Sequence, residues 1–175
     1  MTDILDEIIA HKRLEIEQQK AAISQELLIN NCNEPMPRRS MRASLSASPS
    51  GIIAEFKRRS PSKGWIKENA QADIISPAYE MAGASVLSIL TDENFFGGNL
   101  KDIRAARPQV SLPILRKDFI IDEYQLYQAC IVGADAVLLI AAALRKEQCS
   151  MLAAKAHELK LEVLLEIHSE PQIRN

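Results

Sequence analysis

Short apolar runs alternate with helix-like segments along most of the chain. Five runs are apolar almost throughout and are bounded by glycine, proline or polar residues, which is typical of buried β-strands. They lie at 51–56, 85–90, 113–116, 136–140 and 161–166. Between these runs, apolar positions recur at helical spacing in the segments 73–81, 100–107, 122–132 and 145–159. The pattern therefore predicts a strand–helix unit that repeats along the chain.

The first 50 residues follow a different pattern. Residues 3–29 predict one helix, which Thr2 or Asp3 can cap, because apolar residues recur there at roughly helical spacing. The segment 30–50 contains three prolines and several serines, which interrupt the periodicity and predict a linker. We therefore expect an N-terminal helical extension and linker at 1–50 and a main domain at 51–175.

The repeated unit indicates the fold class. Two helix-to-strand junctions share a phrase, GASVL at 83–87 and GADAVL at 133–138. Strands that are apolar throughout and are separated by helices require a parallel sheet covered by helices, which is either a doubly wound open sheet or a TIM barrel. Both α/β folds place reactive groups at the carboxyl ends of the strands, but only the barrel gathers every strand end around one central pocket.

Composition and charge exclude several classes of function. The chain has 175 residues, a formal charge of -2, 47% hydrophobic and 25% charged residues, which is ordinary for a globular protein. A near-neutral charge argues against a nucleic-acid partner, and the basic residues Arg38, Arg39 and Arg42 are explained by a solvated linker. The acidic start is unlike a signal peptide, and no run approaches about 18 apolar residues, so we expect a cytoplasmic protein without membrane contact.

Cysteine and histidine give no sign of a metal or a disulfide. Cys32, Cys130 and Cys149 are odd in number and lack CxxC spacing, so we expect reduced thiols. No cluster has metal-ligand spacing, so we expect no metal. His11 and His157 fall in helical segments and are expected at the surface, and His168 is expected to cap or line the loop after the last strand.

Polar residues follow four of the five predicted strands. They are Glu55 and Lys57, Thr91 and Asp92, Lys117 and Asp118, and Glu166. In a parallel sheet all these side chains face the same end of the molecule, where their mutual fields in a dry pocket would shift their pKa values towards working pH. The recurrence predicts a catalytic pocket at that end.

The segment 55–64 is the richest in candidate chemistry. Period two places Glu55 and Lys57 on the same side of their strand, and a buried ion pair contributes too little net stability to explain both. The basic residues Lys57, Arg58, Arg59 and Lys63 suit a phosphate or carboxylate. The segment is not a P-loop, because its glycine follows the basic residues.

Four motifs resemble one enzyme family. IIAEFKRRSPSKG at 52–64, TDENFFGG at 91–98, LRKDF at 115–119 and LLEIH at 164–168 are similar to strand-end signatures of indole-3-glycerol phosphate synthases. The N-terminal helix matches the extra helix of that family. The resemblance implies a TIM (βα)8 barrel, here incomplete with about five βα units, and a cofactor-free lyase of tryptophan biosynthesis whose partner is a small phosphorylated substrate.

The resemblance also implies a role for each matched residue. Lys117 corresponds to the general acid of ring closure, and Lys57 to the lysine that contacts the substrate carboxylate and assists dehydration. Glu166 corresponds to the carboxylate that handles protons, and Glu55 to the acidic partner of Lys57. Ser60 belongs to the same signature, and Phe96 and Phe119 correspond to aromatic residues around the anthranilate ring.

The chain, with 175 residues, is shorter than a complete TIM barrel, which usually has roughly 250 residues. Strands six to eight are missing, so we expect the chain alone to be inactive, with open sheet edges that allow self-association. Two alternatives stay open: a non-catalytic half-barrel that associates with a complementary piece, and another sugar-phosphate barrel such as phosphoribosylanthranilate isomerase. The pairing of Glu55 with Lys57 and the motif RKDF at 116–119 argue against the isomerase.

Overall fold

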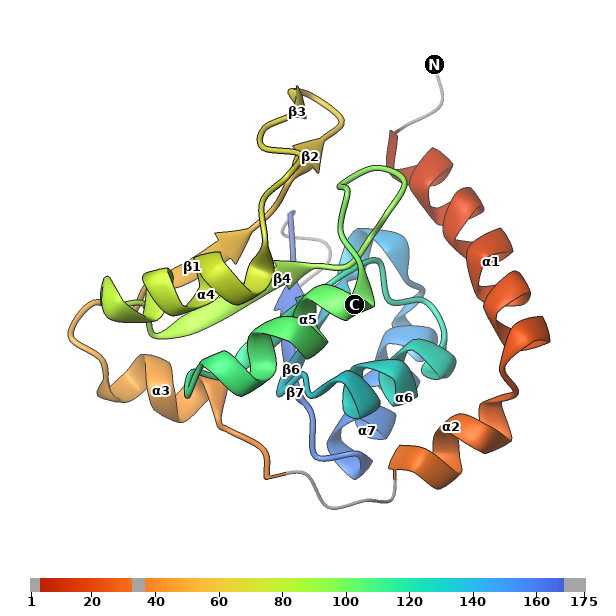
Figure 1. Ribbon diagram of the computed structural model, residues 1–175. Helices are drawn as coiled ribbons and strands as arrows, with labels where there is room; N and C mark the ends of the chain where they lie inside the picture. Colours follow the sequence, from red (N-terminus) through yellow and green to blue (C-terminus); the bar gives the residue numbers. More distant parts are fainter. Residues whose placement is uncertain (1–3, 33–36, 169–175) are drawn as a thin grey trace.

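A five-stranded parallel sheet forms the centre of the molecule (Figure 1). The computed structural model describes residues 4–32 and 37–168. The strands lie side by side in chain order, and every neighbouring pair is parallel. They are β1 (Ile53–Phe56), β4 (Val86–Leu90), β5 (Ile114–Lys117), β6 (Ala136–Ile140) and β7 (Glu162–Glu166). The five predicted strands and the α/β class are confirmed, with bounds that differ by at most two residues.

Four helices connect these strands and cover one face of the sheet. They are α4 (Ala72–Met81), α5 (Leu100–Ala106), α6 (Glu123–Val132) and α7 (Lys146–Glu158), with short 3-10 turns at η1 (Arg107–Gln109) and η2 (Ala141–Ala143). Side chains of Asn99 and Asp122 cap α5 and α6 at their amino ends. Gly133 ends α6 with a left-handed φ of 89°, which glycine adopts without strain. The predicted helices of the repeat are confirmed.

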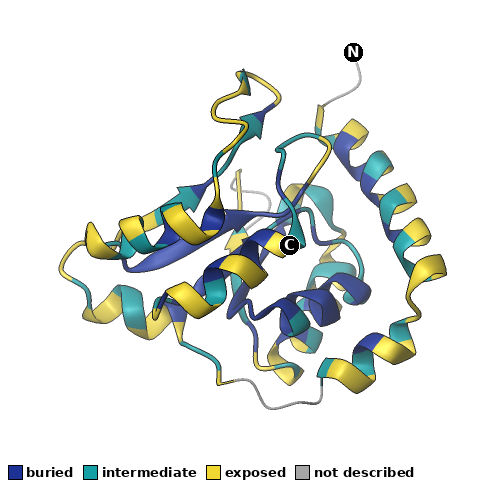
Figure 2. Ribbon diagram, in the orientation of Figure 1, coloured by how far each residue is buried: buried dark blue, intermediate teal, exposed yellow. Residues whose placement is uncertain are grey.

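Alternation along the strands gives the sheet two apolar faces. Leu87, Ile89 and Val137 belong to the large core formed with the covering helices. Val86 and Leu138, on the opposite side of their strands, belong to a second core that includes Met41. Figure 2 shows the resulting buried band through the middle of the sheet. The strands are therefore apolar on both faces, as the continuous runs predicted.

The N-terminal region contains three helices where one helix and a linker were predicted. These are α1 (Ile4–Ala22), α2 (Gln25–Cys32) and α3 (Met41–Ala47). The single helix predicted at 3–29 is wrong, because Ser24 interrupts it and its hydroxyl accepts a hydrogen bond from Leu27 N at the start of α2. Within the predicted linker, Ser40 caps α3 and Met41 packs under the sheet, so tertiary contact stabilises a helix too short to predict from its pattern.

The basic linker residues are not simply solvated. Arg38 donates a hydrogen bond of 2.6 Å to the carbonyl oxygen of Ala134, and the backbone N–H of Arg39 donates to Asp135. The backbone N–H of Arg42 donates to Glu162, which lies in β7. The predicted solvated linker is therefore wrong for Arg38, whose guanidinium is tied to the segment before β6, whereas Arg42 is exposed as predicted.

Two of the three cysteines form a disulfide, contrary to the predicted thiols. Cys32 and Cys130 are joined with their Cα atoms 5.9 Å apart, and Cys149 is free. The bonded residues are 98 positions apart in sequence, and only the packing of α2 against α6 brings them together. Spacing along the chain carries no signal of such a contact.

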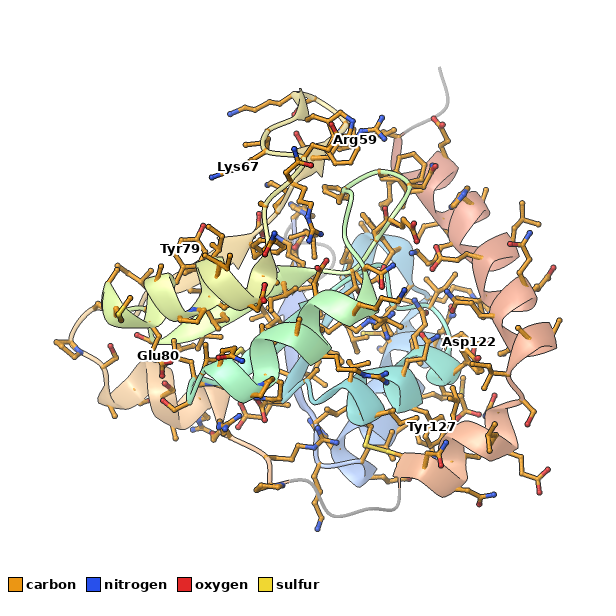
Figure 3. The ribbon with its side chains drawn as sticks, in the orientation of Figure 1. Arg59, Lys67, Tyr79, Glu80, Asp122 and Tyr127 are labelled. Atoms are coloured by element: carbon orange, nitrogen blue, oxygen red, sulfur yellow. A yellow bond between two sulfur atoms is a disulfide. The ribbon has the colours of Figure 1, made fainter. Side chains whose placement is uncertain are left out.

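A small hairpin was not predicted. β2 (Arg59–Ser60) and β3 (Gly64–Trp65) pair antiparallel within the basic segment, beyond the end of β1. Gly64 has a left-handed φ of 64° at the turn, and the guanidinium of Arg59, labelled in Figure 3, lies 5.6 Å from the centre of the Trp65 ring. None of the helices within residues 4–32 and 37–168 is both long enough and apolar enough to cross a membrane.

Candidate active site

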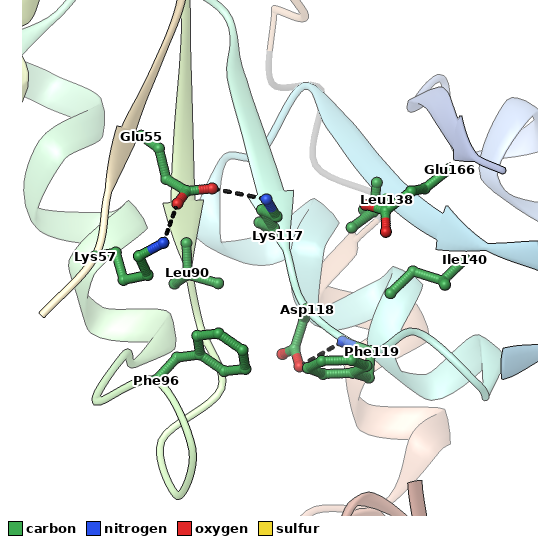
Figure 4. A pocket seen from close by; sticks show the side chains of 10 residues that line it. All are labelled: Glu55, Lys57, Leu90, Phe96, Lys117, Asp118, Phe119, Leu138, Ile140 and Glu166. Atoms are coloured by element: carbon green, nitrogen blue, oxygen red, sulfur yellow. Dashed lines mark hydrogen bonds and ion pairs between the residues drawn. The ribbon is translucent and has the colours of Figure 1, made fainter. Parts of the chain in front are cut away.

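A cavity of about 220 Å³ lies at the carboxyl ends of the strands (Figure 4). It is lined by Glu55, Lys57, Leu90, Phe96, Lys117, Asp118, Phe119, Leu138, Ile140 and Glu166. Six of the seven residues proposed from the sequence line this cavity, and they come from β1, β5, β7 and the three loops that follow β1, β4 and β5. The structure therefore brings together the four ionisable residues that the motifs singled out.

Glu55 lies between two lysines. One carboxylate oxygen of Glu55 is 2.8 Å from Lys57 Nζ, and the other is 2.7 Å from Lys117 Nζ. Glu55 in β1 and Lys57 directly after β1 project to the same side, as period two predicted, and Lys117 reaches Glu55 from β5. Burial alone would raise the pKa of Glu55, but the hydrogen bonds and charges of the two lysines lower that pKa below its ordinary value. Glu55 is therefore an ionised bridge between two ammonium groups.

Glu166 stands apart from this cluster, at the end of β7. Figure 4 shows Leu138 and Ile140 of β6 beside it, on the side of the pocket away from Glu55. Its Oε1 is 2.6 Å from His168 Nε2. His168 was expected only to cap or line the loop, and it also contacts the proposed proton carrier. A carboxylate and two ammonium groups thus face one cavity from different strands, which permits acid and base chemistry on one bound molecule.

Two aromatic rings form an apolar wall. The centroids of Phe96 and Phe119 are 5.9 Å apart with the ring planes tilted by 35°. Phe96 belongs to the loop after β4, which approaches the strand so closely that a Cβ at Gly98 would lie 2.2 Å from the Leu90 carbonyl oxygen. Glycine is therefore required there, and the loop holds Phe96 over the pocket. The wall suits a flat aromatic ligand.

Ser60 lies in a neighbouring cavity of about 740 Å³. That cavity shares Lys57, Phe96 and Glu166 with the smaller one, and Lys63 also lines it. The Ser60 hydroxyl accepts a hydrogen bond from the backbone N–H of Lys63. Ser60 is therefore close to the pocket, and its present contact shapes the hairpin turn.

Arg58 does not serve the pocket as predicted. Its guanidinium forms a two-pronged ion pair with Asp102, at 2.6 and 2.7 Å, and donates to the carbonyl oxygen of Ala70. These bonds tie the segment after β1 to the start of α5. The predicted use of Arg58 for an anionic substrate is wrong, because a neighbouring carboxylate already occupies the guanidinium.

Three further strand-end residues do not take the predicted catalytic role: Thr91, Asp92 and Asp118. Asp118 touches the cavity, but all three belong to a buried polar cluster with Arg116 and Lys12. The sequence interpretation missed Lys12, which is fully buried. A usable signal exists: Lys12 lies four residues from each of the buried residues Ile8 and Ile16, on the apolar side of α1.

The histidines of the helices differ from one another. His157 is exposed on α7, as predicted. His11 is half-buried, with its ring edge-on to Phe95 at 5.7 Å, so its predicted surface position is wrong. In the portion of the chain that is described, no three His, Cys, Asp or Glu side chains are grouped as metal ligands.

Comparison with known proteins matches this chain to one family. The profile of the family "Indole-3-glycerol phosphate synthase" matches residues 5–175. An indole-3-glycerol phosphate synthase of Bacteroides thetaiotaomicron is 68% identical over 173 residues, which are 99% of this chain and 66% of that protein. Those of Neisseria meningitidis serogroup B and Polynucleobacter asymbioticus are 50% and 43% identical, and the match again spans 99% of this chain and 68% of each relative.

The chain thus spans about two thirds of the length of the relatives that it matches. The matched part includes all four motifs and every residue of the pocket. The chain belongs to the indole-3-glycerol phosphate synthase family.

Proposed function

We propose that this chain carries the residues that transfer protons in an indole-3-glycerol phosphate synthase site, and that it is part of a cytoplasmic enzyme. The substrate is 1-(2-carboxyphenylamino)-1-deoxyribulose 5-phosphate, and the products are indole-3-glycerol phosphate, CO2 and water. The observation that carries the proposal is the position of Glu55 between Lys57 and Lys117, opposite Glu166 and beside two aromatic rings. The five parallel strands are, in this proposal, part of a (βα)8 barrel.

Lys117 acts as the general acid of ring closure. The aromatic carbon that bears the carboxylate attacks the ribulose carbonyl carbon, a new carbon–carbon bond forms, and the carbonyl oxygen takes a proton. Lys117 lies at the end of β5, and Glu55 holds its ammonium group within the cavity. The ring is expected to lie against Phe96 and Phe119, which align it for the attack.

Lys57 and Glu166 complete the reaction. Loss of CO2 breaks the bond to the carboxylate carbon and returns the electron pair to the ring. Lys57, which first pairs with that carboxylate, then donates a proton to the departing hydroxyl group, and Glu166 accepts a proton from the new five-membered ring. Water leaves, and the aromatic indole remains. The proposal needs no cofactor, because two ammonium groups and one carboxylate supply the proton transfers.

The test compares the 175-residue chain with a chimera. The chimera continues the chain with the part of the Bacteroides relative that this chain does not match. Product formation is followed by indole fluorescence in the chain, in the chimera, and in a mixture of the chain with the separate remaining part. We expect turnover in the chimera and in the mixture. A folded chimera that binds no substrate and forms no product would contradict the proposal and favour the non-catalytic half-barrel.

A further inference from the structure

Lys12 is a buried lysine in α1, outside the substrate pocket. Its Nζ lies 2.9 Å from Asp92 Oδ2 and 3.1 Å from Asp118 Oδ1, and it donates a hydrogen bond of 2.7 Å to Glu15. Among the described residues no donor is aligned for a hydrogen bond with Asp92 Oδ2, so the contact with Lys12 is an ion pair and Lys12 is the counter-ion of that oxygen.

The cluster keeps Lys12 charged. Burial alone lowers the pKa of Lys12, but the negative charges of Asp118, Asp92 and Glu15 outweigh burial and raise that pKa above its ordinary value. Removal of this buried ammonium group is costly, because the buried carboxylates of Asp92 and Asp118 would lose a partner that water cannot replace there.

The two aspartates hold the two segments that carry the aromatic wall. Asp92 follows β4, and its Oδ1 accepts a hydrogen bond of 2.8 Å from the backbone N–H of Phe95, the residue before Phe96. Asp118 Oδ1 accepts a hydrogen bond of 2.8 Å from the backbone N–H of Phe119. Lys12 therefore joins the Phe96 segment to the Phe119 segment through the two aspartates.

We propose that Lys12 is a positioning residue of the substrate pocket, which fixes the separation of Phe96 and Phe119 by pairing with Asp92 and Asp118. The proposal rests on the proposed function only for the identity of the ligand. Without the ammonium group, Asp92 has no ion-pair partner within residues 4–32 and 37–168, whereas Asp118 keeps Arg116 at 2.8 Å. The carboxylates of Asp92 and Asp118 then repel each other. As a result, the segment that carries Phe96 and the segment that carries Phe119 move apart.

The first measurement is hydrogen exchange at the backbone amides of Phe95 and Phe119 in the 175-residue chain. Lys12→Met keeps the apolar stem and removes the charge. Lys20→Met, on the same helix, is the matched control, because Lys20 pairs with Asp122 in a partly exposed position. We expect exchange at both amides to become about tenfold faster in Lys12→Met and to stay unchanged in Lys20→Met. Unchanged exchange in a folded Lys12→Met variant overturns the proposal.

A kinetic measurement in the chimera separates positioning from a general loss of structure. Lys117 is held by Glu55 and not by Lys12. Lys12→Met is therefore expected to raise KM about tenfold while kcat changes less than about threefold. A fall in kcat with unchanged KM overturns the proposal. An inactive wild-type chimera would contradict the proposed function, and the exchange measurement would then decide the role of Lys12 alone.

A double variant covers the case in which Lys12→Met does not fold. The double variant Lys12→Met/Asp92→Asn removes both charges of the ion pair between Lys12 and Asp92. Asp118 keeps its ion pair with Arg116. The asparagine side-chain oxygen still accepts from Phe95 N, but the link to α1 is lost. We expect Phe119 to exchange about tenfold faster than in the Asp92→Asn single variant. Equal exchange in the two variants overturns the proposal.

Discussion

Two clusters of lysine and carboxylate side chains lie near the carboxyl end of the sheet. They adjoin at the consecutive residues Lys117 and Asp118, and they differ in their exposure to solvent. In the pocket cluster, the side chains of Glu55, Lys57 and Lys117 are 28%, 30% and 36% exposed. In the buried cluster, those of Lys12, Asp92 and Asp118 are 0%, 0% and 1% exposed. Both clusters combine lysine with carboxylate side chains, but only the buried cluster has its lysine on α1, which covers it.

Burial decides what each cluster can do. Partly exposed ion pairs add little stability, because solvent screens them, but their groups can exchange protons with a ligand. Fully buried pairs cannot meet a ligand, and loss of one partner leaves an uncompensated charge. Consecutive residues illustrate the contrast: Lys117 faces the cavity, whereas the carboxylate of Asp118 pairs with Arg116 and Lys12. Changes in the two clusters should therefore affect different measurements.

Lys117→Met should have the largest effect on activity. Removal of the proposed general acid is expected to lower kcat about 10²- to 10⁴-fold in the chimera described above. The free energy of unfolding should change by less than about 1 kcal/mol, because the pair with Glu55 is partly exposed. Lys101→Met, which changes an exposed lysine of α5, is the matched control and should leave both quantities unchanged. An unchanged turnover rate in Lys117→Met would remove the proposed acid.

Asp118→Ala should have the largest effect on stability. It leaves Arg116 and Lys12 without their shared buried partner, so we expect a loss of about 3–5 kcal/mol in urea denaturation. Asp73→Ala, in the exposed first turn of α4, is the control and should cost less than about 1 kcal/mol. Equal losses in the two variants would contradict a special role for the buried cluster.

The pH dependence of stability gives an independent check on Asp118. Burial alone would raise the pKa of Asp118, but the charges of Arg116 and Lys12 outweigh it and hold that pKa well below the ordinary 3.8. The stabilisation is therefore complete above about pH 4 and is lost as pH falls towards the folded-state pKa. Urea denaturation between pH 3 and 6 should show a decline towards acid in the wild type and a weaker decline in Asp118→Ala.

Cys32→Ser should have an intermediate effect. The disulfide ties α2 to α6, and α2 follows the helix that covers the buried cluster. Its loss should lower the free energy of unfolding by about 2–4 kcal/mol under oxidising conditions. Cys149→Ser is the matched control, because Cys149 is free. A wild-type protein whose stability is insensitive to dithiothreitol would contradict the disulfide.

Lys20→Met should have the smallest effect. Lys20 pairs with Asp122, labelled in Figure 3, at 2.7 Å, but both side chains are about one-third exposed. We expect a loss of less than about 1 kcal/mol in the same denaturation measurement. A loss comparable to that of Asp118→Ala would show that burial does not distinguish the pairs of α1.

The repeat and the pocket could be predicted because their signals are local. Apolar runs marked the strands, Gly133 marked the end of α6, and period two placed Glu55 beside Lys57 on one side of β1. The parallel pairing of the strands then followed from the alternation with helices. Helix α3 could not be predicted in this way, because seven residues give too little periodicity and its stability comes from contact with the sheet.

By itself, the sequence determined the α/β repeat, the family and the strand ends that carry Glu55, Lys57, Lys117 and Glu166, because these depend on neighbouring residues and short motifs. Only the tertiary structure decided that Arg58 pairs with Asp102, that Cys32 bonds to Cys130, and that Lys12 pairs with Asp92 and Asp118. Each of these contacts joins residues between 44 and 106 positions apart. Such pairings depend on how elements pack, and no local pattern along the chain records them.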